Sequence, residues 1–459
     1  MPIIKTPIIP VRQSFAKVHA PHELNKEAIC AYMALGFFLD QDTYWKDQVV
    51  LSPASIHELD DAGFLIKSTR YFSWHYQPRS ISFKDSVDEF TTLFEDIIQE
   101  QVGDQQVILP LSGGLDSRSQ AVALKHLNKN IHSYSYKFKG GYPETAIAKK
   151  IASACDFPLE EFTVKEGYLW NSISNLVHLN DGYSEFSHPR QMAIYDEFER
   201  MGALFSLGHW GDVLFDHQVK TNLSEEEELS LLMKKVLKKG GLEIATALWE
   251  AWELEGDFKS YLEGRLSHLL STILIENSSA KIRAFKSTYW APRWTSVNLA
   301  VFEAKRPITV PYYDNRMCEF ICTIPEEHLA DRKIQIQYIK NRNPEVARIP
   351  WQSQRPFNLY TFPKNKPPFN LPYRIANKAK RELKALAGNP YIQRNWELQF
   401  VGPKNEKALE HYLTSEALAD LVPTELTQDF YTKFKTQDAV KYSHPVSMLL
   451  TLAAWKEHL

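Results

Sequence analysis

The stretch LPLSGGLDSRSQ, Leu109–Gln120, joins an apolar strand-like run to a helix through a turn of small residues. Two adjacent glycines destabilise a helix or a strand, so their presence indicates that this turn requires a backbone without side chains. Such a turn is typical of an anion site, because N–H groups at the helix N-terminus point outward and glycines let a phosphate approach. Ser112 and Ser117 add hydroxyl donors, and Asp116 suits a magnesium ion that bridges phosphates.

The spacing of this turn differs from that of two common nucleotide loops. It is not the Walker loop, G-x-x-x-x-G-K-[ST], whose lysine is absent, and it is not G-x-G-x-x-G. A glycine turn that binds nothing is the alternative. A second small-residue motif, LGHWGD at 207–212, argues against that alternative.

Strand-like and helix-like segments alternate around the turn. QVILPL, IHSYSYKF, LEEFTV and ALFSLG indicate strands, and SRSQAVALKHL, PETAIAKKIASAC and EGYLWNSISNLVHL indicate helices. Repeated β-α-β units predict a parallel sheet with helices on both faces, which places the chain in the α/β class. In such sheets, ligands bind beyond the carboxyl ends of the strands, where the glycine turn lies.

The chain of 459 residues is long enough for more than one domain. We expect a strand-rich segment over 1–84, a nucleotide-binding domain over 85–348 with a helical insert after 217, and a proline-rich loop with C-terminal helices over 349–459. The helix that opens the second unit has Asp85 or Ser86 available as its N-cap, and Ser86 with Glu89 fits a capping box.

The charge, the cysteine count and the length of the apolar runs exclude several classes of binding partner. With 53 basic and 56 acidic residues the net charge is −3, so the chain lacks the basic field of a nucleic-acid binder. Four cysteines are too few for a disulfide framework, and Cys318 and Cys322 fit buried thiols better than a metal pair. The longest apolar run, residues 28–39, is too short to cross a bilayer. We therefore expect a cytoplasmic protein that binds neither membrane nor nucleic acid.

Taken together, these motifs resemble the synthetase domain of asparagine synthetase, within the N-type ATP pyrophosphatases or PP-loop superfamily. SGGLDS resembles the pyrophosphate loop S-G-G-x-D-S, LGHWGDVLFD resembles S-G-E-G-x-D-E-L-F, and VPYYDNR resembles V-P-F-L-D-x-R. The resemblance implies an adenine nucleotide alpha hydrolase-like fold. It also implies that ATP is cleaved between its α and β phosphates, with Mg²⁺, to form an acyl-adenylate that an amine attacks.

The resemblance assigns roles to particular residues. Asp116 and Asp212 would hold the magnesium ion of the pyrophosphate. The residues that would bind the nucleotide lie in the loop, at the end of the second strand and in the second motif: Leu111, Ser112, Gly113, Gly114, Asp116, Ser117, Tyr136 and Gly208. Tyr136 would flank the adenine, with an ordinary rim or core aromatic as its alternative.

The chain departs from the family pattern in three places. Residues 28–77 resemble only the closing part of the family's glutaminase domain, so we expect a remnant without glutaminase activity. His209 replaces a glutamate and would take a proton from an attacking amine, or else only packs near the loop. Arg355 lies nearest to the family's missing lysine and would supply a cation against the developing phosphate charge.

The leading hypothesis is an ATP-dependent amide ligase with a small carboxylate substrate. Its nitrogen would come from free ammonia, from an amine, or from a separate glutaminase. Two alternatives stay open: a PP-loop enzyme that adenylates another substrate such as tRNA, and a nucleotide-binding protein without turnover.

Overall fold

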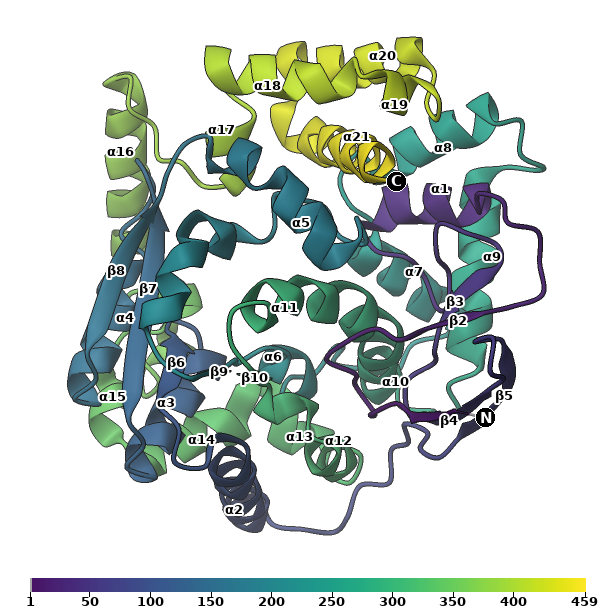
Figure 1. Cartoon of the computed structure of the whole chain (residues 1–459). Helices are drawn as coiled ribbons and strands as arrows, with labels where there is room; N and C mark the ends of the chain where they lie inside the picture. Colours follow the sequence, from purple (N-terminus) through teal and green to yellow (C-terminus); the bar gives the residue numbers. More distant parts are fainter. Residues whose placement is uncertain (1) are drawn as a thin grey trace.

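A five-stranded parallel sheet forms the centre of the computed structural model, which describes residues 2–459 (Figure 1). Its strand order is β10-β9-β6-β7-β8. The strands are β6 (Val107–Pro110), β7 (Ile131–Phe138), β8 (Leu159–Val164), β9 (Leu204–Ser206) and β10 (Ile308–Thr309). The predicted α/β class and parallel sheet are confirmed.

The direction in which successive strands are added to the sheet reverses beside β6. The chain runs from β6 to β7 to β8, then returns to β9 on the other side of β6. Val107 therefore pairs with Ile131 of β7 on one side and with Leu204 of β9 on the other. Ligands of open parallel sheets bind at such a reversal, between the carboxyl ends of the two strands. The loops that follow β6 and β9 thus meet at the sheet's binding edge.

Helices cover both faces of the sheet, as right-handed crossovers in the two directions require. One layer consists of α2 (Phe83–Val102), α3 (Asp116–His126), α4 (Thr145–Ala154), α14 (Lys333–Arg342) and α15 (Pro344–Arg348). The other layer consists of the 3₁₀ segments η1 (Tyr168–Asn171) and η2 (Arg190–Arg200) with α5 (Ile173–Asn180) and α11 (Ser296–Glu303).

Helix α2 begins earlier than the sequence indicated. Its N-cap is Ser82, whose Oγ accepts a hydrogen bond from the Asp85 N–H at 3.1 Å, so the prediction of Asp85 or Ser86 was wrong. Ser82 has the extended backbone of a cap, whereas Ser86 lies inside the helix. The Ser86 hydroxyl is buried and hydrogen-bonds to His328 at 2.9 Å instead of capping the helix.

A second hydrophobic core is helical and lies above and to the right of the sheet in Figure 1. Its central helix is α21 (Ala439–His458), and the apolar run predicted as core forms the buried helix α1 (Lys26–Leu35). The other helices of this core are α7 (Glu225–Val236), α8 (Gly241–Ala251), α9 (Phe258–Ser271), α10 (Ser278–Phe285), α18 (Pro403–Leu413), α19 (Glu416–Ala419) and α20 (Thr424–Thr436).

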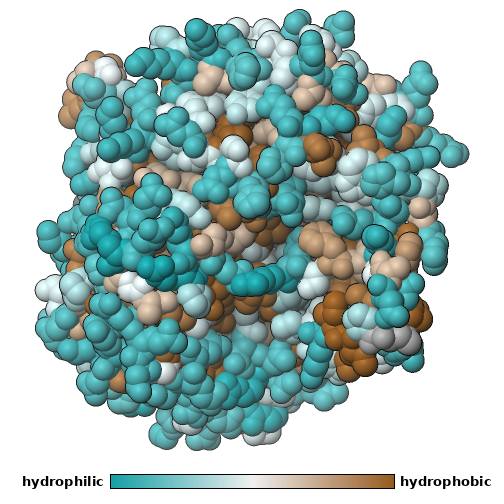
Figure 2. All heavy atoms as spheres, in the orientation of Figure 1, coloured by the Kyte–Doolittle hydropathy of each residue, from teal (hydrophilic) through white to brown (hydrophobic). Residues whose placement is uncertain are grey.

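Short antiparallel strands occupy the first seventy residues. β1 (Ile3–Lys5), β4 (Ser55–Leu59) and β5 (Leu65–Arg70) form one sheet, while β2 (Phe15–Lys17) pairs with β3 (Gln48–Val50). Figure 2 shows a largely hydrophilic face with an apolar patch over the first of these sheets, where Ile3 is 69% exposed.

The remaining elements are short except for one helix. They are α6 (Gly211–Leu214), η3 (Lys286–Thr295), η4 (Pro311–Tyr313), α12 (Asn315–Ile321), α13 (Glu326–Leu329), η5 (Ala330–Arg332), η6 (Gln352–Gln354), η7 (Phe362–Lys364), α16 (Leu371–Leu386) and α17 (Asn395–Gln399). Helix α16 follows the proline-rich loop and buries none of its residues. Across residues 2–459, no helix has both the length and the apolar character that a bilayer crossing requires.

Candidate nucleotide site

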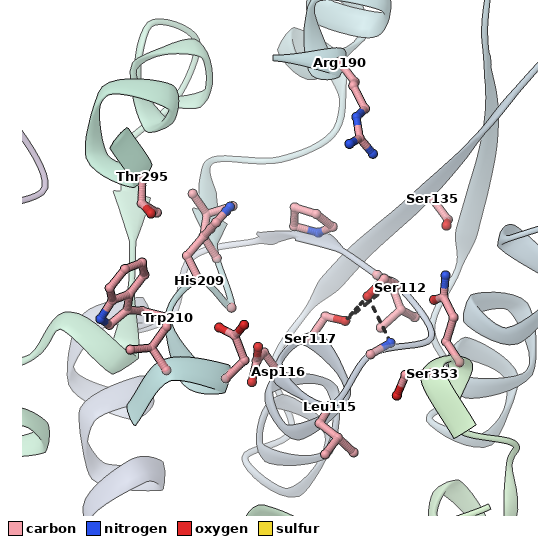
Figure 3. Close-up of a pocket in the computed structure, with 18 of the residues that line it drawn as sticks. Ser112, Leu115, Asp116, Ser117, Ser135, Arg190, His209, Trp210, Thr295 and Ser353 are labelled. Atoms are coloured by element: carbon pink, nitrogen blue, oxygen red, sulfur yellow. Dashed lines mark hydrogen bonds between the residues drawn. The ribbon is translucent and has the colours of Figure 1, made fainter. Parts of the chain in front are cut away.

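A cavity of about 930 Å³ opens at the carboxyl ends of β6, β7 and β9, at the reversal of strand order. The predicted site residues that line it are Leu111, Ser112, Gly114, Asp116, Ser117, Tyr136, Gly208, His209 and Asp212. Ser112, Asp116, Ser117 and His209 surround a common space in Figure 3, and Arg190 extends toward it from the opposite side. The structure thus brings together motifs that are separated by about a hundred residues in the chain.

The loop after β6 is held by its own hydroxyl groups. Ser117 Oγ accepts from the Ser112 N–H at 3.1 Å and lies 3.0 Å from Ser112 Oγ, which in turn accepts from the Gly114 N–H at 3.2 Å. These are the dashed contacts in Figure 3. Helix α3 begins at Asp116, so the N–H groups of its first turn have no carbonyl one turn back in the helix. This turn can therefore receive anionic oxygens.

Two glycines let the loop after β9 approach the start of α3. A Cβ on Gly208 would lie 3.0 Å from the Ser117 nitrogen, and a Cβ on Gly211 would lie 2.3 Å from Asp116 Oδ1. The Ser117 nitrogen belongs to the backbone, and Asp116 Oδ1 is held by Arg332 and Gln335, so neither neighbour can move away freely. Gly208 was predicted from its motif, whereas the requirement at Gly211 was missed.

Asp116 is held by two side chains at the start of α14. Its Oδ1 accepts from Arg332, in an ion pair, and from Gln335 Nε2 at 3.1 Å. Arg332 follows Asp331, and both residues have left-handed backbones, with φ of 63° and 57°. Such a pair of non-glycine residues is strained and needs surrounding contacts to persist. The strained turn directs the Arg332 guanidinium at Asp116.

The carboxylates of Asp116 and Asp212 suit a magnesium ion that takes most of its ligands from phosphates and waters rather than from the protein. Among the described residues, no group of three or more His, Cys, Asp or Glu side chains could hold a metal. Asp116 Oδ2 and the Asp212 carboxylate, however, have no hydrogen bond or ion pair within residues 2–459, and the Asp212 charge helps raise the pKa of Asp116 after burial. Mg²⁺ is commonly bound by one or two carboxylates together with phosphates and waters. The donor set suits that arrangement.

His209 contributes an unpartnered nitrogen to the cavity. Its Nδ1 is buried and has no hydrogen-bond partner among residues 2–459. Burial lowers the pKa of His209 to about 4, although the Asp212 charge opposes that shift. The imidazole is therefore neutral at pH 7, and the orphaned nitrogen is available to a ligand.

Lys286 is a cation of the cavity that the sequence did not reveal. It begins the π-helical segment η3, which also carries Trp290, Trp294 and Thr295 to the cavity wall. Its ammonium lies 5.4 Å from the Trp290 ring centre and 5.8 Å from that of Trp210. Burial lowers the pKa of Lys286 to about 8, and the Asp212 charge opposes the shift. π-helical turns often lie at functional positions, but no sequence pattern predicts them.

The proline-rich segment after α15 closes over the loop. Arg118, fully buried in α3, donates to the carbonyls of Ile349 at 3.0 Å, Pro350 at 2.8 Å and Gly113 at 3.2 Å. Gln352 Oε1 accepts the Gly113 N–H at 3.0 Å. The predicted nucleotide ligand Gly113 is thereby engaged by this segment and is not among the residues that line the cavity.

Arg355 does not line the cavity, although Gln352 and Ser353 of the same segment do. Its Nε and Nη2 are buried, and neither has a hydrogen-bond partner in the part of the chain that the structure describes. The cations that line the cavity are Arg190, Lys286 and Arg332. The role assigned to Arg355 stays a prediction, and the structure offers other residues for it.

Comparison with known proteins finds one family model that covers the two motif loops. Residues 89–216 match the family model described as asparagine synthase. That segment contains both motif loops and the first four strands of the sheet in chain order. No curated protein matches the chain. One similar solved structure is that of NMN synthetase from Francisella tularensis, at 10% identity and a TM-score of 0.23, covering 45% of this chain and 93% of that one.

Proposed function

We propose that the chain is an amide-forming ligase, because residues 89–216 match the model of the asparagine synthase family, an ATP-utilising synthetase type. It adenylates a carboxylate and transfers the acyl group to ammonia or an amine, releasing AMP and pyrophosphate. The observation that carries the proposal is the meeting of Asp116 and Asp212 beside the glycine loop. The carboxyl ends of β6 and β9 bring them to one cavity.

In the first step, a carboxylate oxygen of the substrate attacks the α-phosphorus, and the bond to the bridging oxygen breaks. The loop from Ser112 to Ser117 binds the leaving pyrophosphate, and Lys286 offsets the charge that develops on it. Asp116 and Asp212 would hold Mg²⁺, which neutralises phosphate charge when bound.

In the second step, the amine nitrogen attacks the acyl carbon and AMP leaves. The nitrogen must lose a proton as the amide forms. His209 Nδ1 has no partner among the described residues and faces the cavity, so it is placed to accept that proton, and the Asp212 charge offsets part of the basicity that burial removes. This is the role that the sequence suggested for it.

The test needs no knowledge of the natural amine. Hydroxylamine serves as a surrogate nucleophile with a panel of small carboxylates, ATP and Mg²⁺, and the assay measures hydroxamate, AMP and pyrophosphate. We expect all three in equal amounts. Asp212→Asn should abolish them, whereas Asp196→Asn, a change at a 98% exposed carboxylate, should not.

The other outcomes separate the alternatives. ADP in place of AMP would contradict the proposal. ATP binding without AMP, whatever acceptor is supplied, would favour a nucleotide-binding protein without turnover. AMP formed only with tRNA would favour an RNA substrate.

A further inference from the structure

Helix α16 carries its apolar side chains in one stripe along the helix. The residues of this stripe recur every three or four positions and so share one face: Leu371, Ile375, Ala379, Leu383 and Leu386. Ile375 and Leu383 are each 66% exposed, and Leu386 is 85% exposed. In a typical helix of a globular protein such a stripe faces the core, whereas here it is open to solvent.

The opposite face of α16 is the one that touches the rest of the protein. All residues of the helix are exposed except Tyr373 and Lys384, which lie three turns apart on the side away from the stripe. The Lys384 ammonium lies 4.0 Å from the Tyr391 ring centre, and that ring stacks on Tyr142 at 4.3 Å. These contacts turn the stripe outward at the margin of the molecule (Figure 1), and Figure 2 shows apolar atoms at the same corner.

Positive charge flanks the stripe. The cations of α16 are Arg374, Lys378, Lys380, Arg381 and Lys384. Lys378 lies to one side of the stripe and Lys380 to the other. The one acid of the helix, Glu382, lies near an edge of the stripe, and its Oε1 is 3.8 Å from Lys378 Nζ. Five cations and one acid give this helix a net charge of +4, in a chain whose net charge is −3.

The combination of an outward apolar stripe and flanking cations fits an anionic lipid surface. The acyl boundary of a bilayer receives an apolar stripe, while headgroup phosphates receive the cations on either side of it. A second copy of α16 would bring two positively charged faces together, which is unfavourable. Nucleic acid would pair with the cations through its phosphates but would leave the stripe in water. The bilayer alone satisfies both features.

We propose that α16 anchors the protein on an anionic membrane surface, with its stripe in the acyl boundary and its cations at the headgroups. The expectation that the chain binds no membrane rested on the length of its apolar runs. That length tests for a helix that crosses a bilayer, and not for one that lies on it. The anchor does not depend on the proposed ligase function.

The test is flotation of the full chain with vesicles of phosphatidylglycerol and phosphatidylcholine in equal parts, beside vesicles of phosphatidylcholine alone. We expect binding to the anionic vesicles to be at least about tenfold tighter, because each cation near the surface contributes. Added salt should weaken this binding, since it screens the attraction between the cations and the headgroups.

Two pairs of variants assign the binding to α16. Leu383→Asn should weaken vesicle binding about tenfold, because an apolar side chain no longer enters the acyl boundary, whereas Leu274→Asn, at a side chain that is 90% exposed, should bind as the wild type does. Lys380→Gln with Arg381→Gln should also weaken it about tenfold. The matched control is Lys404→Gln with Lys407→Gln, at two exposed cations of α18. All four variants should unfold in urea as the wild type does, since the replaced side chains are exposed.

The other outcomes overturn the anchor. Absence of binding to the anionic vesicles, or equal binding by Leu383→Asn and the wild type, would exclude it. Binding to polyglutamate that is as tight as binding to the vesicles would replace the bilayer with an acidic protein. A concentration-dependent dimer that Leu383→Asn abolishes would assign the stripe to a second copy of the chain instead.

Discussion

The two adjacent cavities of this protein differ in their balance of charge: acids and cations both line the nucleotide cavity, whereas cations predominate in the second. The nucleotide cavity has two acidic side chains at its floor, Asp116 and Asp212, beside the glycine loop. The second cavity, of about 370 Å³, shares Arg190 with the first and is bounded by the start of α17 and by α21. The side chains of Lys238 and Arg190 on its wall have no hydrogen bond or ion pair among the described residues. A triphosphate can approach the first only with a cation between it and the carboxylates, whereas a carboxylate can enter the second directly. The placement of these charges thus favours a metal-bound triphosphate in the first cavity and a free carboxylate in the second.

The largest effect is expected when Asp116 is replaced. Asp116→Ala should lower pyrophosphate release by at least about 100-fold, since it removes a group expected to stabilise the transferring phosphates. Rates of pyrophosphate release measure the effect. Vesicle binding through α16 should be unchanged, and undiminished pyrophosphate release would contradict the role of Asp116.

Chelation provides the second test. Removing Mg²⁺ with EDTA should weaken ATP binding about tenfold or more, because the two carboxylates then face the phosphates unshielded. Calorimetry with and without added Mg²⁺ measures this effect. Vesicle binding should not respond, and equal ATP affinity in EDTA would remove the metal role of Asp116 and Asp212.

A smaller effect is expected from Gly211→Ala. The new Cβ would lie 2.3 Å from Asp116 Oδ1 and 2.9 Å from the Tyr312 ring, so α6 must shift. We expect a loss of about 1–3 kcal/mol in the free energy of unfolding, measured with urea. Gly264→Ala is the control: a Cβ there meets nothing within 4 Å, and alanine favours the helix α9. Equal stability of the Gly211 variant and the wild type would disprove the close approach.

The smallest effect concerns pH and the second cavity. Burial lowers the pKa of His444 to about 4, below the unfolded value of about 6.5, while its Nε2 lies 2.9 Å from the Met33 carbonyl oxygen. The unfolded chain therefore binds more protons between these values, so stability present above pH 6.5 is lost as pH falls toward 4. The contribution is about 1 kcal/mol between pH 7 and pH 5.5. His444→Gln should flatten the urea-unfolding profile, and an unchanged profile would contradict this.

Much of the fold was accessible from sequence because its signals are local. The segments 131–138 and 159–164 were expected as strands and are β7 and β8 with those bounds. Asp116, Gly208 and Asp212 were recognised from short motifs, and all three line the predicted cavity. Periodicity and motif spacing are properties of a few consecutive residues, so no tertiary information was needed.

The rest of the site depends on contacts between distant segments. Arg332 reaches Asp116 only because residues 331–332 adopt left-handed backbones, and Lys286 lines the cavity only because a π-helical segment starts there. Neither conformation has a sequence signature. Arg118 resembles any polar residue of a helix until its three carbonyl partners are known. The cap of α2 was misplaced for a related reason, since three nearby polar residues could each fill that position.

The three hydrogen bonds from Arg118 to carbonyl oxygens limit how the protein can be divided into fragments. They fasten the phosphate loop to residues 349 and 350, more than 130 positions beyond the end of the segment that matches the family model. A fragment cut to residues 89–216 would expose a buried guanidinium and release one side of the loop. A fragment that keeps the shape of this loop must therefore extend at least through residue 350, and the motif transplanted alone into another scaffold would lose these contacts.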